Sequence, residues 1–164
     1  MSKVDVDFDF KWLKKKQKKL DNYIGESKGI NMDQHVEDRN KALLVEFGEF
    51  INEVPELFKY WSNKKMKRDE ALEEFVDGIH FLISLSNDLG IEEYEYNEPK
   101  EVKTDELVLS IYYKMSVLLK MNNFKELMDE YLYLGYSLGF TNDEIIDFYR
   151  DKNDKNYERQ NNGY

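Results

Sequence analysis

Cysteine is absent from the 164-residue chain, which excludes a disulfide framework and a thiolate metal site. Only 2 histidines are present, and this disfavours a zinc site. No apolar run reaches the roughly 18 residues of a membrane span, and no hydrophobic segment of a secretory signal opens the chain. The sequence therefore predicts a soluble cytoplasmic protein without a membrane partner, and the lack of cysteine fits a reducing compartment.

Helix breakers are also scarce, because the chain has 2 prolines and 8 glycines. No strand pattern, repeat or low-complexity stretch interrupts the helical periodicity. The length suits one domain with a proper core. We therefore predict an all-α protein in which residues 1–164 form a single helical bundle of about six helices. The net charge of −10, from 34 acidic and 24 basic residues, disfavours a general nucleic-acid surface.

Capping residues and breakers predict where each helix begins and ends. Pro55 should kink or divide the second helix, because proline lacks the amide proton that an interior turn needs. Gly78 should mark the close approach of another backbone beside Asp77. The predicted helices run from Asp9 to about Ile24, from Asp33 or Glu37 to Trp61, from Asp69 to near Gly90, from Thr104 to Asn122, from Phe124 to about Leu138, and from the capping box Thr141–Glu144 toward Gln160.

Two helical segments each carry a pair of acidic residues three positions apart. Glu46 and Glu49 form the first pair, and Glu74 and Asp77 form the second. Residues at this spacing share a helix face, and both pairs border apolar stripes, so burying the stripes turns four carboxylates toward one space. Unpaired buried charges are costly, whereas Mg²⁺ takes oxygen ligands and leaves room for water and phosphate. One such pair is usually a solvated face; two pairs favour a metal site.

The final helix combines basic and amide side chains in an otherwise acidic protein. Lys152, Lys155 and Arg159 share one face, and Asn153 and Asn156 lie beside them. Lysine offers a point charge and arginine a planar fork for phosphate oxygens. This face complements a metal-bound triphosphate, although a solvated, fraying terminus explains the same charge pattern.

These motifs resemble a known group of enzymes. E-x-x-E followed by E-x-x-D on paired helices resembles the all-α nucleoside triphosphate pyrophosphatase superfamily, which includes dimeric dUTPases and MazG-like enzymes. Three segments, in the family's order, are similar to the dimeric dUTPase branch: FKYW at Phe58–Trp61, EEFVDGIHFLISL at Glu73–Leu85, and KNDKNYERQNNGY at Lys152–Tyr164.

The resemblance implies a function and a mechanism. A dUTPase of this branch hydrolyses dUTP to dUMP and pyrophosphate, and dUDP as well, with Mg²⁺ as cofactor. Glu46, Glu49, Glu74 and Asp77 are expected to hold two or more metal ions, which lower the pKa of a bound water. The water attacks the α-phosphate in line, with Glu49 as the base. The family also implies a homodimer whose active sites lie near the subunit interface.

The resemblance assigns further binding residues. For sugar and phosphates it points to the C-terminal segment 150–164, which we expect to be mobile when free and to close over the nucleotide; the matching residues are Lys152, Asn156, Arg159 and Tyr164. For the nucleobase the matching residues are Gln17, Asp21, Trp61, His80 and Phe81. From the residues alone, Gln17 interrupts an apolar stripe and could instead be its partly exposed edge, and Trp61 could belong to the core.

Two other functions remain open from the sequence. One is a MazG-like or dCTP-directed pyrophosphatase on the same scaffold, which a panel of nucleotides would separate. The other is a non-catalytic helical binding module, which predicts no Mg²⁺ dependence and no stabilisation by nucleotide.

Overall fold

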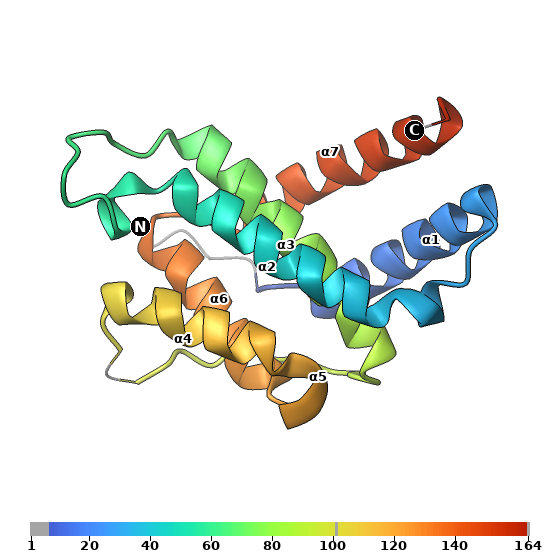
Figure 1. Ribbon diagram of the computed structural model, residues 1–164, viewed down its shortest axis with the longest axis horizontal. Coiled ribbons are helices and arrows are strands. Elements are labelled where there is room, and N and C mark those ends of the chain that lie inside the picture. The colour runs from blue at the N-terminus through green and yellow to red at the C-terminus, as the bar shows by residue number, and fades with distance from the viewer. Residues whose placement is uncertain (1–6, 101, 164) are drawn as a thin grey trace.

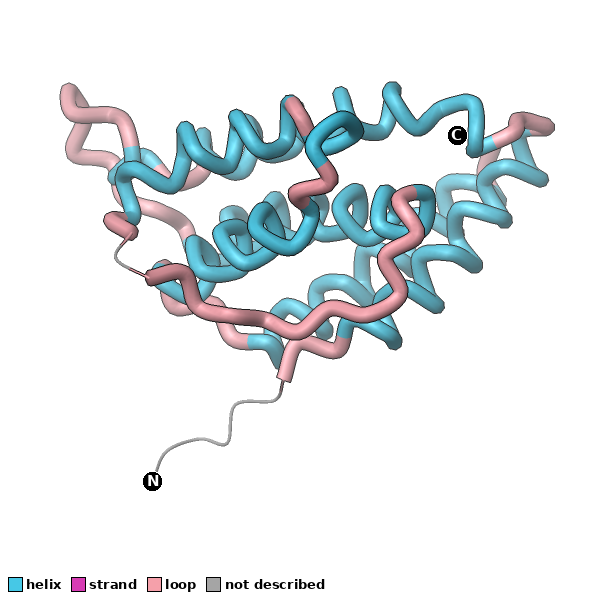
Figure 2. Tube along the Cα trace, turned by 90° about the horizontal axis from the view of Figure 1, so that it is seen from below, coloured by secondary structure: helices cyan, strands magenta, loops and turns pink. Residues whose placement is uncertain are grey.

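The computed structural model describes residues 7–100 and 102–163, in which helices are joined by loops and no strand occurs (Figures 1 and 2). The helices are α1 (Phe10–Lys28), α2 (Val36–Asn52), α3 (Arg68–Asp88), α4 (Thr104–Ser116), α5 (Leu118–Met121), α6 (Phe124–Ser137) and α7 (Asn142–Asn161), with 3₁₀ turns at Met32–His35 and Pro55–Leu57. The all-α prediction is confirmed. Over these residues, none of the helices combines the length and the apolar character needed to cross a bilayer.

Helix α3 is the centre of the bundle. It contacts α1, α2, α6 and α7, and its side chains Phe75, Ile79 and Leu82 are fully buried. Their spacing of three or four residues places them on one face of the helix. The Phe75 ring stacks on Tyr131 of α6 at 4.6 Å and meets Phe50 of α2 edge-on at 5.2 Å. This aromatic cluster holds α2 and α3 together beneath the acidic pairs.

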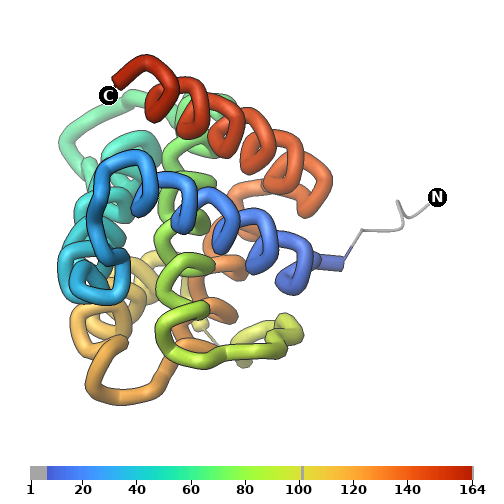
Figure 3. Tube along the Cα trace, turned by 90° about the vertical axis from the view of Figure 1, so that its right-hand side faces the viewer, coloured from blue at the N-terminus to red at the C-terminus, as the bar shows by residue number. Residues whose placement is uncertain are grey.

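Helices α1 and α7 lie next to each other on one side of α3, while α4 and α6 lie on the other (Figures 1 and 3). Helix α7 begins with the predicted capping box, in which the Thr141 side chain accepts from the Glu144 amide and the Glu144 side chain accepts from the Thr141 amide. The buried Ile145 and Tyr149 then fix its first half to the core. Helix α7 thereby packs against α1.

Helix α1 has the predicted start and a later end. The Asp9 side chain accepts from the Trp12 amide at 3.1 Å, which confirms the cap. The helix continues through the buried Gly25 to Lys28, and Gly29 ends it with a left-handed φ of 64°. The expected end near Ile24 was therefore too early. A Cβ at Gly25 would lie 3.1 Å from the Ile30 carbonyl oxygen, so a larger residue here would require a small shift of the chain.

Pro55 divides the second predicted helix. Helix α2 ends at Asn52, a 3₁₀ turn follows at Pro55–Leu57, and residues 58–61 form a non-helical loop. The prediction that helix continues to Trp61 was therefore wrong beyond Asn52, because proline cannot supply the amide proton of an interior turn. The predicted fourth helix is likewise divided, into α4 and the short α5.

Gly78 makes room for a side chain. A Cβ at this position would lie 2.1 Å from the Tyr131 hydroxyl oxygen, and that hydroxyl donates to the Phe75 carbonyl at 2.6 Å. The expectation that another backbone approaches here was wrong, since the neighbour is a phenol ring from α6. Gly78 therefore lets Tyr131 pack directly beneath Asp77.

Candidate active site

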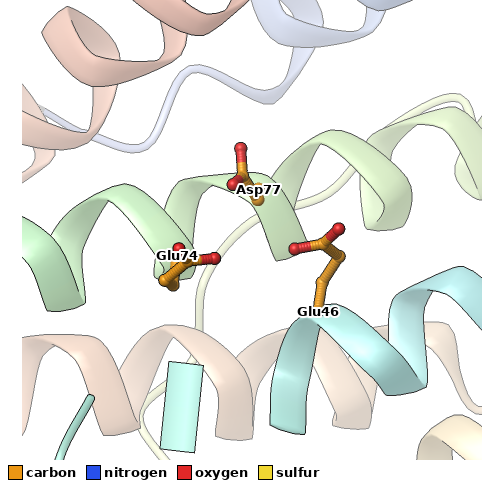
Figure 4. A group of neighbouring side chains, drawn as sticks. All are labelled: Glu46, Glu74 and Asp77. Atoms are coloured by element: carbon orange, nitrogen blue, oxygen red, sulfur yellow. The ribbon is translucent and has the colours of Figure 1, made fainter. Parts of the chain in front are cut away.

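Three of the four predicted metal ligands form a compact cluster. Glu46 comes from α2, and Glu74 and Asp77 come from successive positions on one face of α3 (Figure 4). Each offers one carboxylate oxygen, and these oxygens all lie within 4.8 Å of one another. Glu49 lines the same cleft, one turn further along α2. The two i,i+3 pairs therefore meet across the α2–α3 contact, as the spacing predicted.

The cluster is electrostatically strained without a cation. Burial raises the pKa of Glu46 to about 7, and the charges of Asp77 and Glu49 add to this effect. Burial together with Asp77 and Glu49 also raises the pKa of Glu74 to about 7. Burial raises the pKa of Asp77, even though Lys152 opposes the shift. Because like charges at this distance cannot all ionise cheaply, these carboxyl groups lose their protons at a higher pH than isolated carboxyl groups do.

The donor set suits a hard divalent cation. All ligand atoms of the cluster are carboxylate oxygens, and the Glu46 Oε2 atom is buried with no hydrogen-bond partner among the described residues. Such an atom is costly unless something binds it. Mg²⁺ binds oxygen ligands and retains open positions for water and phosphate. The residues present therefore fit the metal that the sequence predicts.

The cluster opens into a cleft of about 430 Å³ lined by residues of α1, α2, α3 and α7. Most of the predicted site residues gather there, although they come from four separate helices. The cleft is lined by eleven of them: Gln17, Asp21, Glu46, Glu49, Glu74, Asp77, His80, Phe81, Lys152, Asn156 and Arg159.

Lys152 connects α7 to the acidic cluster. Its Nζ atom lies 2.8 Å from Glu73 Oε1 and 3.1 Å from Asp77 Oδ2, and its side chain is only 14% exposed. Burial alone lowers the pKa of Lys152, but the hydrogen bond to Glu73 and the charge of Asp77 outweigh it and raise the pKa. Glu73 was missed by the sequence reasoning, although it lies one turn before Asp77 on the same helix face.

The rest of the C-terminal segment is helical and packs on α1. The Tyr157 ring lies 5.0 Å from that of Tyr23, and the Tyr23 hydroxyl donates to the Asn161 side chain. Asn156 and Arg159 line the cleft from this helix. Tyr164 lies outside the described residues. The expected mobility of residues 150–164 before nucleotide binds stays a prediction.

Gln17 is a buried and fully engaged amide. Its side chain is 4% exposed, so it is not the exposed edge of an apolar stripe. Its Oε1 atom lies 2.6 Å from the Tyr149 hydroxyl and 2.8 Å from His80 Nδ1, and its Nε2 atom donates to Asp21 Oδ1 at 3.0 Å. The His80 ring stacks on Tyr149 at 3.9 Å. The end of the cleft next to Gln17 is thus a hydrogen-bonded framework.

Arg39 and Ser84 extend this framework and were missed from the sequence. Arg39 Nη1 donates to Ser84 Oγ at 2.7 Å, and Ser84 donates to Asp21 Oδ2 at 2.7 Å. The Arg39 guanidinium also forms a two-point ion pair with Asp88, at 2.5 and 3.0 Å. A signal existed: Arg39 occupies the stripe position four residues before the buried Leu43, where an apolar residue is the norm.

A family model described as dUTPase matches residues 9–164 of the chain. The chain belongs to the dUTPase family. It is a dUTP diphosphatase, an enzyme that hydrolyses dUTP. A comparison with curated proteins finds no match. The family match begins at the cap of α1 and includes every helix that lines the cleft. The acidic cluster therefore lies within the matched residues of this dUTPase.

Trp61 is one predicted residue that this dUTPase chain does not bring to its own cleft. It lies in the loop after the Pro55 turn and is 64% exposed. Its ring meets Phe58 and Tyr60 edge-on, at 6.2 and 4.9 Å. Trp61 does not line the described cleft. Its predicted contact with the nucleobase therefore stays a prediction.

Proposed function

We propose that this dUTPase hydrolyses dUTP to dUMP and pyrophosphate with Mg²⁺ held by Glu46, Glu49, Glu74 and Asp77. The observation that supports this is the meeting of two opposite charge patterns in one cleft. The oxygens of Glu46, Glu74 and Asp77 lie within 4.8 Å of one another, and Lys152, Asn156 and Arg159 line the same cleft from α7. A metal-bound triphosphate needs both an oxygen-ligand cluster and cationic donors.

The residues of the cleft divide the work of the reaction. Bound divalent cations supply charge neutralisation for the phosphates and a more acidic water. Glu49 takes the proton of the attacking water. The water oxygen forms a bond to the α-phosphorus, the bond to the α–β bridging oxygen breaks, and pyrophosphate leaves. Lys152 and Arg159 bind the phosphate oxygens, and Arg159 does so as a two-point fork.

The nucleobase lies at the other end of the cleft. Gln17, Asp21, His80 and Phe81 line that end, and we assign them to the uracil ring. A pocket too tight for a 5-methyl group excludes dTTP. Since the base and the α-phosphate are the same in dUDP, the enzyme also hydrolyses dUDP, with phosphate as the leaving group.

The active form is a homodimer in the cytoplasm, where free nucleotides are available. The exposure of Phe58, Tyr60 and Trp61 supports a second copy, because an exposed aromatic surface is typical of an interface. Size-exclusion chromatography with light scattering should give about twice the monomer mass of 19.8 kDa. A monomer that retains full activity contradicts this arrangement, and cell fractionation tests the compartment.

One assay tests the proposed reaction. Pyrophosphate or phosphate release is measured for each deoxynucleoside triphosphate and for dUDP, with Mg²⁺ and with a chelator. We expect dUTP and dUDP to be hydrolysed only with Mg²⁺. Preference for dCTP or similar turnover of every nucleotide supports the MazG-like or dCTP-directed alternative. Activity that persists in the chelator removes the metal from the mechanism.

A further inference from the structure

One ring nitrogen of His80 has no hydrogen-bond partner among residues 7–100 and 102–163. The ring is 6% exposed, it lines the cleft, and its Nε2 atom is buried without a hydrogen bond in the described part of the chain. The other nitrogen, Nδ1, lies 2.8 Å from Gln17 Oε1. An amide oxygen can only accept, so Nδ1 must carry the proton.

The orientation of the Gln17 amide decides this tautomer. Gln17 Nε2 lies 3.0 Å from Asp21 Oδ1. A carboxylate oxygen accepts, so the amide nitrogen faces Asp21 and the amide oxygen faces His80. In a flipped amide, the Gln17 oxygen would meet the Asp21 oxygen. The Tyr149 hydroxyl, 2.6 Å from Oε1, also donates to the amide oxygen.

Asp21 is in turn held as an acceptor from its other side. Arg39 Nη1 lies 2.7 Å from Ser84 Oγ, and a guanidinium cannot accept. Ser84 therefore accepts from Arg39 and donates its own proton to Asp21 Oδ2, at 2.7 Å. Asp88 anchors Arg39 with two hydrogen bonds. The hydrogen bonds converge on Asp21: Arg39 donates to Ser84 and Ser84 to one carboxylate oxygen, while Gln17 donates to the other.

The imidazole is neutral in this setting. Burial lowers the pKa of His80 to about 3, and the charge of Lys152 acts in the same direction. A neutral imidazole has one proton. Since Gln17 places that proton on Nδ1, Nε2 is left as a bare acceptor.

We propose that the chain Arg39–Ser84–Asp21–Gln17 fixes the tautomer of His80, so that Nε2 accepts the N3–H of uracil and rejects cytosine. This inference rests on the proposed base site. Uracil carries a proton at N3, whereas cytosine has a lone pair there. A bare Nε2 therefore pairs with uracil and faces a second lone pair in cytosine. Arg39 and Ser84 are positioning residues, which act on the base through Asp21, Gln17 and His80.

The tautomer can be measured without any turnover. The chain has 2 histidines, so ¹⁵N spectra of histidine-labelled His35→Gln protein report on His80 alone. We expect Nδ1 to show the signal of a protonated nitrogen and Nε2 that of an unprotonated one at neutral pH. Addition of dUMP should shift the Nε2 signal as an accepted hydrogen bond does, and dCMP should not. A proton on Nε2 in the free protein overturns the proposal.

The variant Asp21→Asn tests the control of the tautomer. It keeps the side-chain shape, but its amide can accept from Ser84 and present its NH2 group to Gln17, which favours a flipped Gln17 amide. We expect a mixture of His80 tautomers and a fall of at least about tenfold in the dUTP-to-dCTP ratio of kcat/KM, mainly through KM. Asp129→Asn makes the same substitution at a carboxylate that accepts from Tyr94 and the Asn97 amide, away from the cleft, and should leave the ratio unchanged.

The two kinds of failure are separable. If wild-type protein does not hydrolyse dUTP with Mg²⁺, the proposed reaction fails while the NMR result still decides the tautomer. If Asp21→Asn is folded and keeps both the Nδ1–H tautomer and the nucleotide ratio, the inference is overturned. If Asp21→Asn does not fold, Ser84→Ala is used instead, because it removes one donor to Asp21. Its ¹⁵N spectra and its dUTP-to-dCTP ratio of kcat/KM are measured, and the ratio should again be smaller than that of the wild type.

Discussion

Lys152 on α7 donates a hydrogen bond to Asp77 on α3, with 3.1 Å between Nζ and Oδ2. The same ammonium lies 2.8 Å from Glu73 Oε1. A residue assigned to phosphate therefore contacts a residue assigned to metal in the protein alone. The lysine partly neutralises the acidic cluster, and so it competes with the cation that the cluster would bind.

The first prediction concerns this competition. Lys152→Met removes the positive charge from Asp77, so Mg²⁺ should bind the nucleotide-free protein at least about threefold more tightly. The metal-free protein should become less stable, because Asp77 and Glu73 lose their partner. Hydrolysis of dUTP should fall, since a phosphate ligand is lost. Isothermal titration calorimetry, thermal denaturation and kcat/KM measure the three effects.

Lys155→Met is the matched control. It makes the same change of charge on an exposed residue of the same helix. It should change Mg²⁺ affinity less than Lys152→Met does. Equal effects of the two substitutions would mean that only net charge matters, and the contact with Asp77 would have no special role.

The second prediction concerns Glu49. Glu49→Gln keeps the shape of the side chain but removes a negative ligand and the proposed base, so hydrolysis of dUTP should fall at least about a hundredfold. The metal-free protein should keep or gain stability, because the charge of Glu49 raises the pKa values of Glu46 and Glu74. Glu70→Gln, on the exposed first turn of α3, is the control. Near-normal turnover of Glu49→Gln removes it from the mechanism.

The third prediction concerns pH. The pKa of Glu46 is about 7 in the folded protein against an ordinary value of 4.5. As pH rises, the Glu46 carboxyl group therefore loses its proton at a lower pH in the unfolded chain than in the folded protein. The stability that the raised pKa contributes is fully present below pH 4.5 and is lost as pH rises toward 7. Glu46→Gln should then stabilise metal-free protein more at pH 8 than at pH 5, in melting experiments.

The same proton gives a second measurement. Binding of Mg²⁺ needs ionised carboxylates, so it should release protons and tighten as pH rises toward 7. Saturating Mg²⁺ should also stabilise the wild type, and so reduce the difference in melting temperature between the wild type and Glu46→Gln. This reduction should be larger at pH 8 than at pH 5. A difference that does not depend on pH contradicts the raised pKa.

The fourth prediction concerns Gln17. From the sequence, Gln17→Leu should fit the apolar stripe and keep or raise stability. The structure reverses this expectation, because leucine would leave Tyr149, His80 and Asp21 without their shared partner. We expect a loss of about 1–3 kcal/mol in the free energy of unfolding for each buried group left unpaired. Binding of dUTP should weaken by about 1–3 kcal/mol as well, if Gln17 also contacts the base.

Chemical denaturation and KM for dUTP measure these two effects separately. Gln17→Glu offers a comparison, because a carboxylate can still accept from Tyr149 and His80 but meets Asp21 with like charge. Unchanged stability of Gln17→Leu would contradict the buried network. Lost stability with unchanged KM would make Gln17 a structural amide only.

The fifth prediction concerns the end of α7. Truncation after Arg150 should leave a folded bundle with its acidic cluster, because the buried Ile145 and Tyr149 remain. It should abolish most hydrolysis. Arg159→Ala alone should cost about 2–4 kcal/mol in transition-state stabilisation, and Arg159→Lys should restore only part of it, since a point charge cannot replace a fork. Circular dichroism and kcat/KM are the measurements, and full activity in the truncated chain would falsify the assignment of this segment to the site.

The local signals in the sequence anticipated much of the fold. The Asp9 cap, the Thr141–Glu144 capping box and the division at Pro55 all depend on contacts within a few residues, and the structure has each of them. The meeting of Glu46 with Glu74 and Asp77 also followed from helical spacing, because the two apolar stripes had to pack against each other. These features depend on short segments of sequence and can be predicted without the rest of the chain.

The partners of the buried polar groups were decided only by the tertiary structure. Gln17 looked like the exposed edge of a stripe or an isolated reader of the base, yet it binds Tyr149 from 132 positions along the chain. Arg39 and Ser84, 45 positions apart, lie together in the same network. A hydrogen bond needs atoms about 3 Å apart in a suitable direction, and only the packing of α1, α2, α3 and α7 sets such distances between distant residues. Periodicity gives the face that a residue occupies, whereas the packed bundle gives the atom that it meets.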